Sequence, residues 1–183
     1  LYRKSSLLLG SIGHQVFAPD IQILELPHLH KGLASSAFDD DGVATVERKI
    51  VENGIVQGYF LSSYSARKLG LRTTGNAGGT HNLIMQNAAP MRFDALLKKM
   101  GTGLLVTELM GHGINAVTGD YSRGASGFWV ENGAITYPVE EITIAGNLKD
   151  MFRGILAIGD DVIVRGSKQC GSVLIDRMTI AGG

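Results

Sequence analysis

The sequence is poor in cysteine and has no long apolar run, the features that are typical of secreted and of membrane-spanning proteins. It contains one cysteine, Cys170, which excludes an internal disulfide and is typical of proteins that fold in a reducing compartment. No uninterrupted apolar run approaches the ~20 residues that a membrane-spanning helix needs. We therefore predict a cytoplasmic protein that makes no membrane contact.

An excess of charge of either sign is also absent. Seventeen Lys and Arg residues balance seventeen Asp and Glu residues. Because nucleic-acid binding depends on a positive surface that meets the phosphates, this balance argues against direct contact with DNA or RNA. With 44% hydrophobic residues the chain can bury a sizeable core, so we predict one domain over residues 1–183.

Glycine, by contrast, is abundant, with 25 residues that separate short apolar runs. This pattern favours tight turns over long helices. Hairpins are predicted at Asn53-Gly54 and Asn132-Gly133, because Asn-Gly supplies the positive φ angles of a two-residue turn between strands. The tetrapeptide Val-Glu-Asn-Gly occurs at both turns. Convergent turn chemistry and a faint internal duplication both explain the repeat.

These patterns predict an α+β fold, rich in β-structure, with mainly antiparallel hairpins and two or three short helices. The clearest helix is 93–100, where apolar residues recur at a spacing of three or four and Gly101 follows as a left-handed cap. Short helices are also expected at 1–11 and at 148–155, the latter with Asn147 as its N-cap. Further strands are expected at 21–26, 103–108, 142–144, 155–158, 162–164 and 173–180.

The loop at residues 73–82 consists almost entirely of turn-forming residues and is either a binding site or an ordinary surface turn. Thr80, His81 and Asn82 place three hydrogen-bonding side chains at its exit. Loops held by rigid elements often carry function, which favours a site over a flexible linker, but an ordinary surface turn is the more common outcome for such a segment. The glycine spacing fits neither common phosphate-binding motif.

Two short patterns resemble metal sites but lack the required spacing. His28 and His30 have no third ligand nearby, so we expect ordinary loop or surface histidines. The aspartates at 39–41 are consecutive, whereas a calcium loop places its oxygens at alternate positions and ends in a distant Glu. We therefore expect a solvated turn there.

A third pattern, from Thr107 to His112, resembles the zinc-peptidase motif His-Glu-x-x-x-His. Glu108 and His112 fit it, but Thr107 stands where the first ligand would be. A zinc site needs three or four ligands, so we do not assign one to this segment.

Four longer stretches resemble the C-terminal half of the TldD/PmbA family. They are residues 62–82, 101–133, 135–155 and 167–183, in the family's order and over nearly the whole chain. The likeness is stronger to the PmbA-type subunit than to the TldD-type subunit. The chain also begins with Leu1 rather than Met, so we expect a piece of a longer protein from which the N-terminal half is absent.

The resemblance implies a cytoplasmic zinc metalloprotease assembled from TldD-type and PmbA-type subunits. Such complexes cleave peptides and unfolded segments, in peptide-antibiotic maturation and antitoxin degradation, and carry the older name modulator of DNA gyrase. In the TldD-type subunit a His-Glu-x-x-x-His helix and a C-terminal cysteine hold zinc. Cys170 falls on that cysteine, and the helix has no counterpart in this chain.

The resemblance therefore implies no cofactor in this chain and zinc in a TldD-type partner. A lone thiolate cannot hold zinc, so Cys170 is expected to be a buried structural thiol and the fragment to be inactive alone. Thr80, His81 and Asn82 become candidate peptide-binding residues. The isolated chain could also form a homodimer.

Three functions follow from these observations. The first is a largely non-catalytic scaffold that encloses a peptide or unfolded substrate beside the TldD-type subunit. The second is an active metallopeptidase domain that contributes Cys170 as a zinc ligand. The third is a regulatory protein that binds DNA gyrase.

Overall fold

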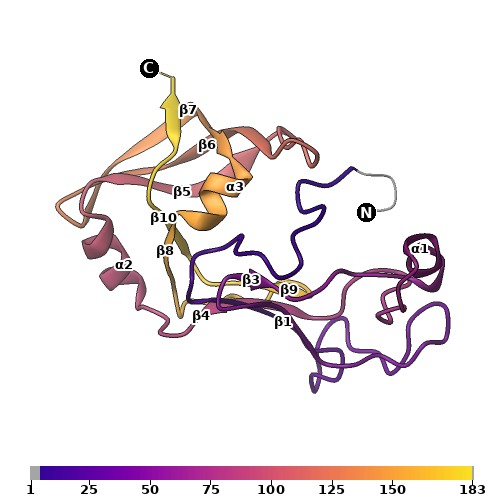
Figure 1. Cartoon of the computed structure of the whole chain (residues 1–183). Helices are drawn as coiled ribbons and strands as arrows, with labels where there is room; N and C mark the ends of the chain where they lie inside the picture. Colours follow the sequence, from indigo (N-terminus) through magenta and orange to yellow (C-terminus); the bar gives the residue numbers. More distant parts are fainter. Residues whose placement is uncertain (1–4, 183) are drawn as a thin grey trace.

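The computed structural model describes residues 5–182, which form three sheets and three short helices (Figure 1). Every strand pairing in these sheets is antiparallel except that between β4 and β9. The predicted α+β fold, rich in antiparallel β-structure, is confirmed. Within residues 5–182 no helix is long and apolar enough to cross a bilayer.

The first sheet has five strands in the order β3-β2-β1-β4-β9. Its members are β1 (Ile21–Glu25), β2 (Arg48–Glu52), β3 (Ile55–Val56), β4 (Leu83–Asn87) and β9 (Lys168–Gln169). The central strand β1 pairs with β2 on one side and with β4 on the other. Helix α1 (Ser63–Leu69) lies between β3 and β4 in sequence, at one end of this sheet (Figure 1).

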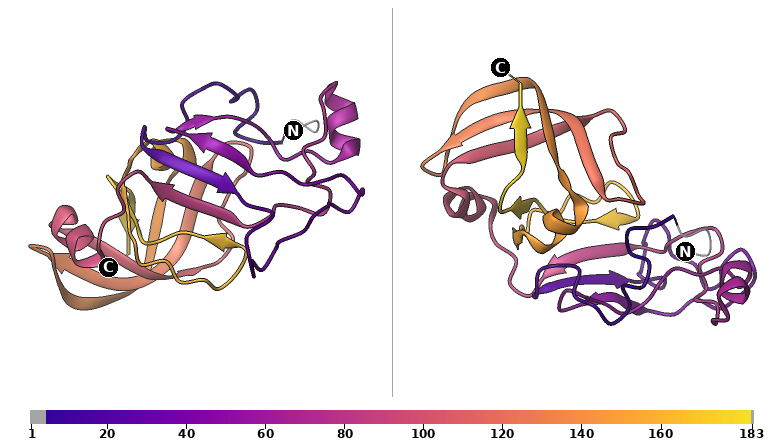
Figure 2. Two further views of the ribbon diagram at one scale, coloured as in Figure 1. Left: turned by 90° about the horizontal axis from the view of Figure 1, so that it is seen from below. Right: turned by 45° about the horizontal axis from the view of Figure 1, so that its top comes forward.

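The second sheet has four strands in the order β11-β7-β6-β5. Its members are β5 (Gly103–Met110), β6 (Asp120–Glu131), β7 (Ala134–Asn147) and β11 (Thr179–Ala181). The β6–β7 hairpin is the longest pairing in the described chain and carries two register shifts. Such bulges increase the twist of a long hairpin, as the curved ribbons in Figure 2 show.

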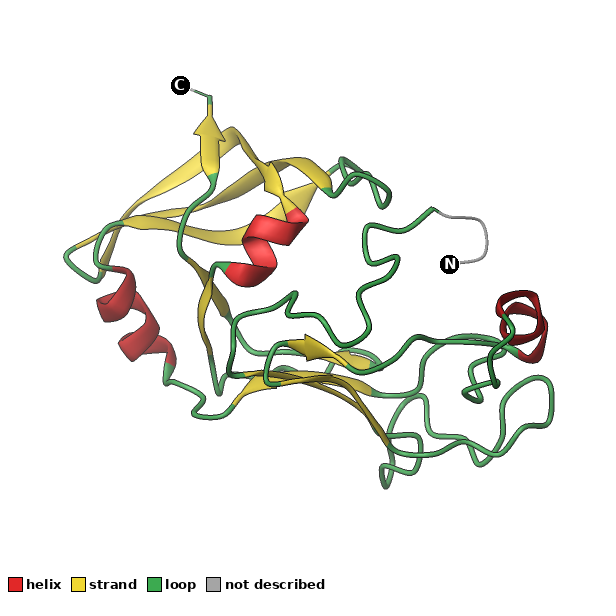
Figure 3. Cartoon of the chain, viewed as in Figure 1, coloured by secondary structure: helices red, strands yellow, loops and turns green. Residues whose placement is uncertain are grey.

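Strands β8 (Ile155–Ile158) and β10 (Val173–Ile175) form a small sheet between the two larger ones. Helix α2 (Phe93–Met100) leads from β4 to β5, and helix α3 (Leu148–Arg153) leads from β7 to β8. Figure 3 shows α2 and α3 beside the four-stranded sheet and α1 at the far end of the five-stranded one.

Buried apolar side chains form three clusters, one for each sheet region. The first joins the five-stranded sheet to β8, the second lies under the four-stranded sheet, and the third joins α2 to β8 and β10. Their buried members are respectively Val16, Phe17, Ala18, Ile21, Val51, Val56, Ile155 and Ile158; Tyr121, Ala125, Ile142 and Ile144; and Leu96, Ala157 and Leu174.

Local signals account for several element boundaries. Helix α2 spans the predicted 93–100, and Asn147 caps α3 by accepting a hydrogen bond from the Lys149 backbone nitrogen. Gly101 has φ 70° and ψ −81°, so it ends α2 with positive φ but outside the left-handed helical region that we predicted. Both Asn-Gly hairpins are present, at β2–β3 and β6–β7.

Other predictions from the sequence are wrong. The described part of the predicted helix at 1–11 consists of turns, with positive φ at Gly10, and residues 1–4 lie outside the described chain. Residues 162–164 have strand-like composition but no neighbouring strand to pair with, so they are irregular. The predicted strand at 173–180 is two strands, β10 and β11, in different sheets.

Helix α1 was not predicted, although its signals are local. The Ser62 side chain accepts from the Ser65 backbone nitrogen at the N-terminus, and Gly70 ends the helix at φ 65° and ψ 27°. The helix buries only Ala66. A seven-residue helix with one buried residue has too short an apolar face to be read as a periodic pattern.

Candidate functional site

The glycine-rich loop at residues 73–82 connects α1 to β4 and packs over a buried polar network. Gly75, Gly78 and Gly79 have φ angles of 70°, 90° and 135°, so the loop backbone takes conformations that other residues rarely adopt. The loop is held at its start by hydrogen bonds from the Thr74 backbone nitrogen and the Thr73 hydroxyl to the Leu61 carbonyl. It is therefore a fixed structure and not a loose linker.

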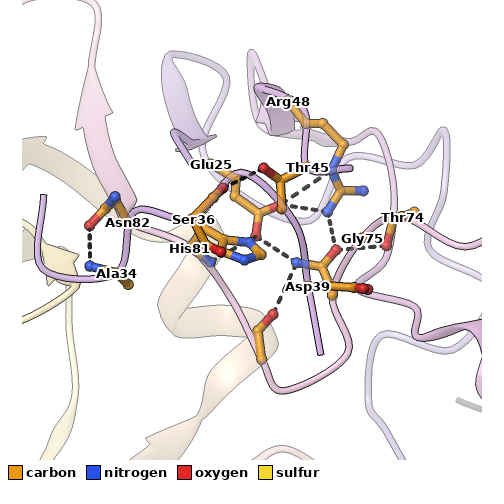
Figure 4. A network of polar contacts seen from close by, with 12 residues as sticks. Glu25, Ala34, Ser36, Asp39, Thr45, Arg48, Thr74, Gly75, His81 and Asn82 are labelled. Atoms are coloured by element: carbon orange, nitrogen blue, oxygen red, sulfur yellow. Dashed lines mark hydrogen bonds and ion pairs between the residues drawn. The ribbon is translucent and has the colours of Figure 1, made fainter. Parts of the chain in front are cut away.

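At the centre of the network is Glu25, the last residue of β1, whose side chain is 1% exposed. Its Oε2 atom accepts two hydrogen bonds from Arg48, one from Nη2 at 2.6 Å and one from Nε at 3.2 Å. Its Oε1 atom accepts from the Asn76 side chain at 2.7 Å and from the His81 backbone nitrogen at 2.9 Å (Figure 4). A buried carboxylate needs such donors, because removal from water without them is very costly.

Asn76 connects the loop to this ion pair. Its side-chain oxygen accepts from Arg48 Nη2 at 2.8 Å and from the Thr74 hydroxyl at 2.7 Å. Its side-chain nitrogen donates to Glu25 and to the Gly79 carbonyl. One amide therefore joins β1, β2 and both ends of the glycine-rich turn.

Asp39 forms a second fixed point beneath the loop. Its carboxylate accepts from the backbone nitrogens of Asp41, Val43 and Ala77, each at 2.9 Å. Burial acts to raise the pKa of Asp39, but these three N–H groups, with His81 nearby, outweigh burial and hold the pKa below its ordinary value. The solvated turn predicted here is wrong for Asp39, which is buried, whereas its neighbours Asp40 and Asp41 are exposed.

The three predicted site residues differ in their surroundings. Asn82 is fully buried; its oxygen accepts from the Ala34 backbone nitrogen, and its nitrogen donates to the Leu26 carbonyl and the Ser35 hydroxyl. His81 is buried with Nδ1 at 3.4 Å from Glu25 Oε1. Thr80 is half-buried, and its side chain makes no hydrogen bond within residues 5–182. The structure thus brings His81 to Glu25 and leaves Thr80 available.

Sequence reasoning missed the residues that organise this site, namely Glu25, Asp39, Arg48 and Asn76. One signal was available for Glu25, which ends an otherwise apolar strand directly before Leu26-Pro27. No comparable signal marks Arg48 and Asn76, because their contacts with Glu25 join residues 23 and 51 positions apart. Asp39 combines a local turn, with Asp41 and Val43, and one distant contact, with Ala77.

Cys170 follows β9 and lies half-buried against the cluster that joins the five-stranded sheet to β8. Burial, together with the negative charge of Asp161, raises the pKa of its thiol. The Asp161 carboxylate is itself fixed by the backbone nitrogen of Ser172 at 2.8 Å and by the Ser172 hydroxyl at 2.6 Å. This environment favours the neutral thiol, whereas a metal ligand must be a thiolate.

The donor atoms around Cys170 do not fit a zinc site by themselves. Within residues 5–182 no three His, Cys, Asp or Glu side chains lie close enough together to hold a metal ion. His28 and His30 are exposed, and His28 contacts the Thr45 hydroxyl at 3.0 Å. Glu108 and His112 are likewise exposed, at the end of β5 and just beyond it.

Comparison with known proteins supplies the family. Residues 1–182 match the family described as the PmbA/TldA metallopeptidase C-terminal domain. The chain is 58% identical over 182 residues to metalloprotease PmbA of Escherichia coli O157:H7, which covers 100% of this chain and 40% of that protein.

Two crystal structures share the fold. A Thermotoga maritima MSB8 protein with the provisional name modulator of a DNA gyrase matches with a TM-score of 0.89 and 40% identity, covering 98% of this chain and 43% of that one. TldE from Thermococcus kodakarensis matches with a TM-score of 0.86 and 22% identity, covering 98% and 44%. The chain therefore spans about two fifths of the length of these relatives.

Proposed function

The chain belongs to the PmbA/TldD family of metallopeptidases as its C-terminal domain, and from this premise we propose that it is the largely non-catalytic half of a two-subunit zinc protease. In this proposal the domain supplies scaffold and peptide-contacting surface, and a TldD-type subunit supplies the zinc. The substrates are peptides and unfolded segments, in peptide-antibiotic maturation and antitoxin degradation.

The environment of Cys170 is the observation that carries the proposal. Its thiol is half-buried against apolar side chains, beside the carboxylate of Asp161, and both features disfavour the thiolate. A catalytic zinc needs three protein ligands and an open position for water. Cys170 alone cannot meet that requirement, so hydrolysis must use ligands from outside this chain, and we propose that a TldD-type subunit supplies them.

The four-stranded sheet offers suitable surface for an extended peptide. Strand β5 is an edge strand of eight residues, and no strand within the described residues pairs with its second edge. Nearby on the β6–β7 hairpin, Phe128, Ile135 and Tyr137 are 37%, 47% and 52% exposed. Open edges bind extended chains through backbone hydrogen bonds, and neighbouring apolar side chains add affinity.

The glycine-rich loop is the second proposed peptide contact. Thr80 would contribute directly through its free hydroxyl, while His81 and Asn82 hold the loop backbone in place through their buried contacts. We further propose that the protein works in the cytoplasm, in line with its single cysteine. A homodimer of the isolated chain is the alternative to the pairing with a TldD-type subunit.

Two other functions have some support. The thiol of Cys170 is only half-buried, so ligands from elsewhere could complete a zinc site on it, as an active metallopeptidase domain would require. The provisional name of the Thermotoga maritima relative favours a regulatory contact with DNA gyrase. The zero net charge makes a protein contact more plausible for that role than direct DNA binding.

Metal analysis of the whole protein, alone and with a TldD-type subunit, tests these functions. We expect stoichiometric zinc and hydrolysis of an unfolded substrate only when the partner is present, and no loss of zinc from the complex on Cys170→Ser. Stoichiometric zinc in the protein alone, removed by Cys170→Ser, would establish the active domain instead. Capture of gyrase in the absence of the TldD-type subunit would support the regulatory role.

A further inference from the structure

A pocket of about 220 Å³ lies between α3 and the segment of chain that leads into β1. Figure 1 shows α3 facing this segment. Leu7, Leu8 and Val16 give the pocket an apolar wall, and Lys149 and Arg153 of α3 border it with two positive charges. It is separate from the glycine-rich loop and from Cys170, and neither site uses its residues.

The two cations have no partner in the described chain. Neither the Lys149 ammonium nor the Arg153 guanidinium makes a hydrogen bond or an ion pair within residues 5–182. Lys149 lies in the first turn of α3, where the helix dipole disfavours a cation, whereas Arg153 lies in the last turn, where the dipole favours one. Local helix stability therefore does not explain the position of Lys149.

Two further polar side chains, His14 and Ser11, line the pocket. Nδ1 of His14 lies 3.1 Å from the Ile12 carbonyl oxygen and must carry the proton there, because a carbonyl only accepts. This leaves Nε2 of His14 without a partner. The Ser11 hydroxyl is also unengaged within the described residues. The free hydrogen-bond donors beside the apolar wall are therefore the Lys149 ammonium, the Arg153 guanidinium and the Ser11 hydroxyl.

We infer that this pocket binds a carboxylate joined to an apolar group, namely the C-terminal residue of a peptide. The carboxylate would meet Lys149 and Arg153, and the last side chain would lie against Leu7 and Leu8. Arginine binds carboxylates through two parallel hydrogen bonds, which gives both affinity and orientation. This inference rests on the proposed peptide-enclosing function and adds recognition of a free chain end.

Binding of three fluorescent peptides to the whole protein tests the inference. The first ends in leucine with a free carboxylate, the second is its C-terminal amide, and the third is the same amide with one internal glutamate. We expect the free acid to bind at least tenfold more tightly than the amide. If the internal glutamate restores the affinity, the pocket binds any peptide carboxylate and the assignment to a chain end is overturned.

Paired variants locate the effect. Lys149→Gln with Arg153→Gln should weaken binding of the free acid at least tenfold and leave binding of the amide unchanged. Arg72→Gln with Lys98→Gln removes the same charge from exposed cations elsewhere and should change neither peptide's affinity. Circular dichroism verifies that all variants are folded.

Two results would contradict the proposals, and they are distinguishable. If the parent binds acid and amide equally well, or the α3 double variant keeps the preference for the acid, the carboxylate pocket is wrong and the peptide-enclosing function stands. If the parent binds none of the three peptides, the peptide-enclosing function fails as well.

Discussion

At the scale of single residues, Glu25 shows how the five-stranded sheet contains a charge that water does not reach. Arg48 supplies the opposite charge with its side chain 17% exposed, and Asn76 and His81 satisfy the other carboxylate oxygen. Breaking such a pair from one side leaves an uncompensated charge in a poorly solvated position. The network therefore specifies the position of the glycine-rich loop as well as adding stability.

Glu25→Gln should lower the free energy of unfolding by about 3–5 kcal/mol, because Arg48 then loses its buried counter-charge. Urea denaturation of parent and variant measures this difference. Glu52→Gln is the matched control, since Glu52 pairs with Lys49 at the surface and should cost less than about 1 kcal/mol. If both variants lose the same free energy of unfolding, the buried ion pair contributes no more to stability than the surface pair.

Asp39 should make stability depend on acidity. Its pKa is lowered in the folded state, so its contribution is fully present well above the ordinary value of about 3.9 and is lost as pH falls through that value towards the folded one. The stability difference between the parent and Asp39→Asn should therefore be constant from neutral pH to about pH 5 and shrink below pH 4. Urea denaturation over this range measures it, and a difference that grows on acidification would contradict the assignment.

At the scale of elements, one tetrapeptide makes two hairpins in different surroundings. Asn53 and Gly54 have φ angles of 50° and 77°, and Asn132 and Gly133 have 51° and 75°, as a two-residue hairpin turn requires. The first turn packs against the segment before β1, and the second packs against α2 at Lys98. The turn conformation is local, whereas the packing partner is determined by the fold.

Gly54→Ala should destabilise the protein more than Gly42→Ala, although both glycines have a φ near 76°. An alanine Cβ at 54 would lie 2.5 Å from the Phe17 carbonyl oxygen, while nothing lies within 4 Å of one at 42. Gly42→Ala is the control and should lower the free energy of unfolding by about 1–2 kcal/mol, because alanine is strained at positive φ. Gly54→Ala should lower it by at least ~2 kcal/mol more, because of the added steric overlap. Thermal and urea unfolding compare the two, and equal costs would rule out the steric explanation.

At the scale of the whole molecule, α3 connects the two main sheets. Leu148 and Met151 pack into the cluster under the four-stranded sheet, and Phe152 packs into the cluster of the five-stranded sheet. The Phe152 ring stacks on Phe17 with centroids 4.6 Å apart. Figure 2 shows the two sheets as separate layers on either side of this connection. A six-residue helix therefore packs against both cores.

Phe152→Ala should uncouple the sheets as well as destabilise the first core, at a cost of about 3–5 kcal/mol. Trp129, the single tryptophan, lies in β6 and reports on the four-stranded sheet alone. Its fluorescence and far-UV circular dichroism should give coincident thermal transitions in the parent and separated ones in the variant.

Tyr137→Ala is the control for this experiment, because it removes an exposed aromatic ring from β7 and should leave the two transitions coincident. If the two thermal transitions of Phe152→Ala coincide, and their midpoint temperature equals that of the parent, α3 does not couple the sheets.

The family, the β-rich class, both Asn-Gly turns, α2 and the start of α3 at Asn147 could all be predicted from the amino-acid sequence. Each local feature depends on a few contiguous residues, because turn angles, caps and the apolar stripe of a helix are encoded within a turn or two. The strand predicted at residues 162–164 was wrong. These residues have the composition of a strand, but they do not pair with another strand.

The strand order and the buried network around Glu25, by contrast, depend on long-range packing and became known from the folded structure alone. β4 and β9 are parallel neighbours although more than 80 residues separate Leu83 from Lys168. Glu25, Arg48 and the pair Asn76 and His81 come from three separate segments of the chain, namely β1, β2 and the glycine-rich loop. No short-range sequence pattern can predict these contacts. Polar groups that are distant in sequence become hydrogen-bond partners only when folding buries them together.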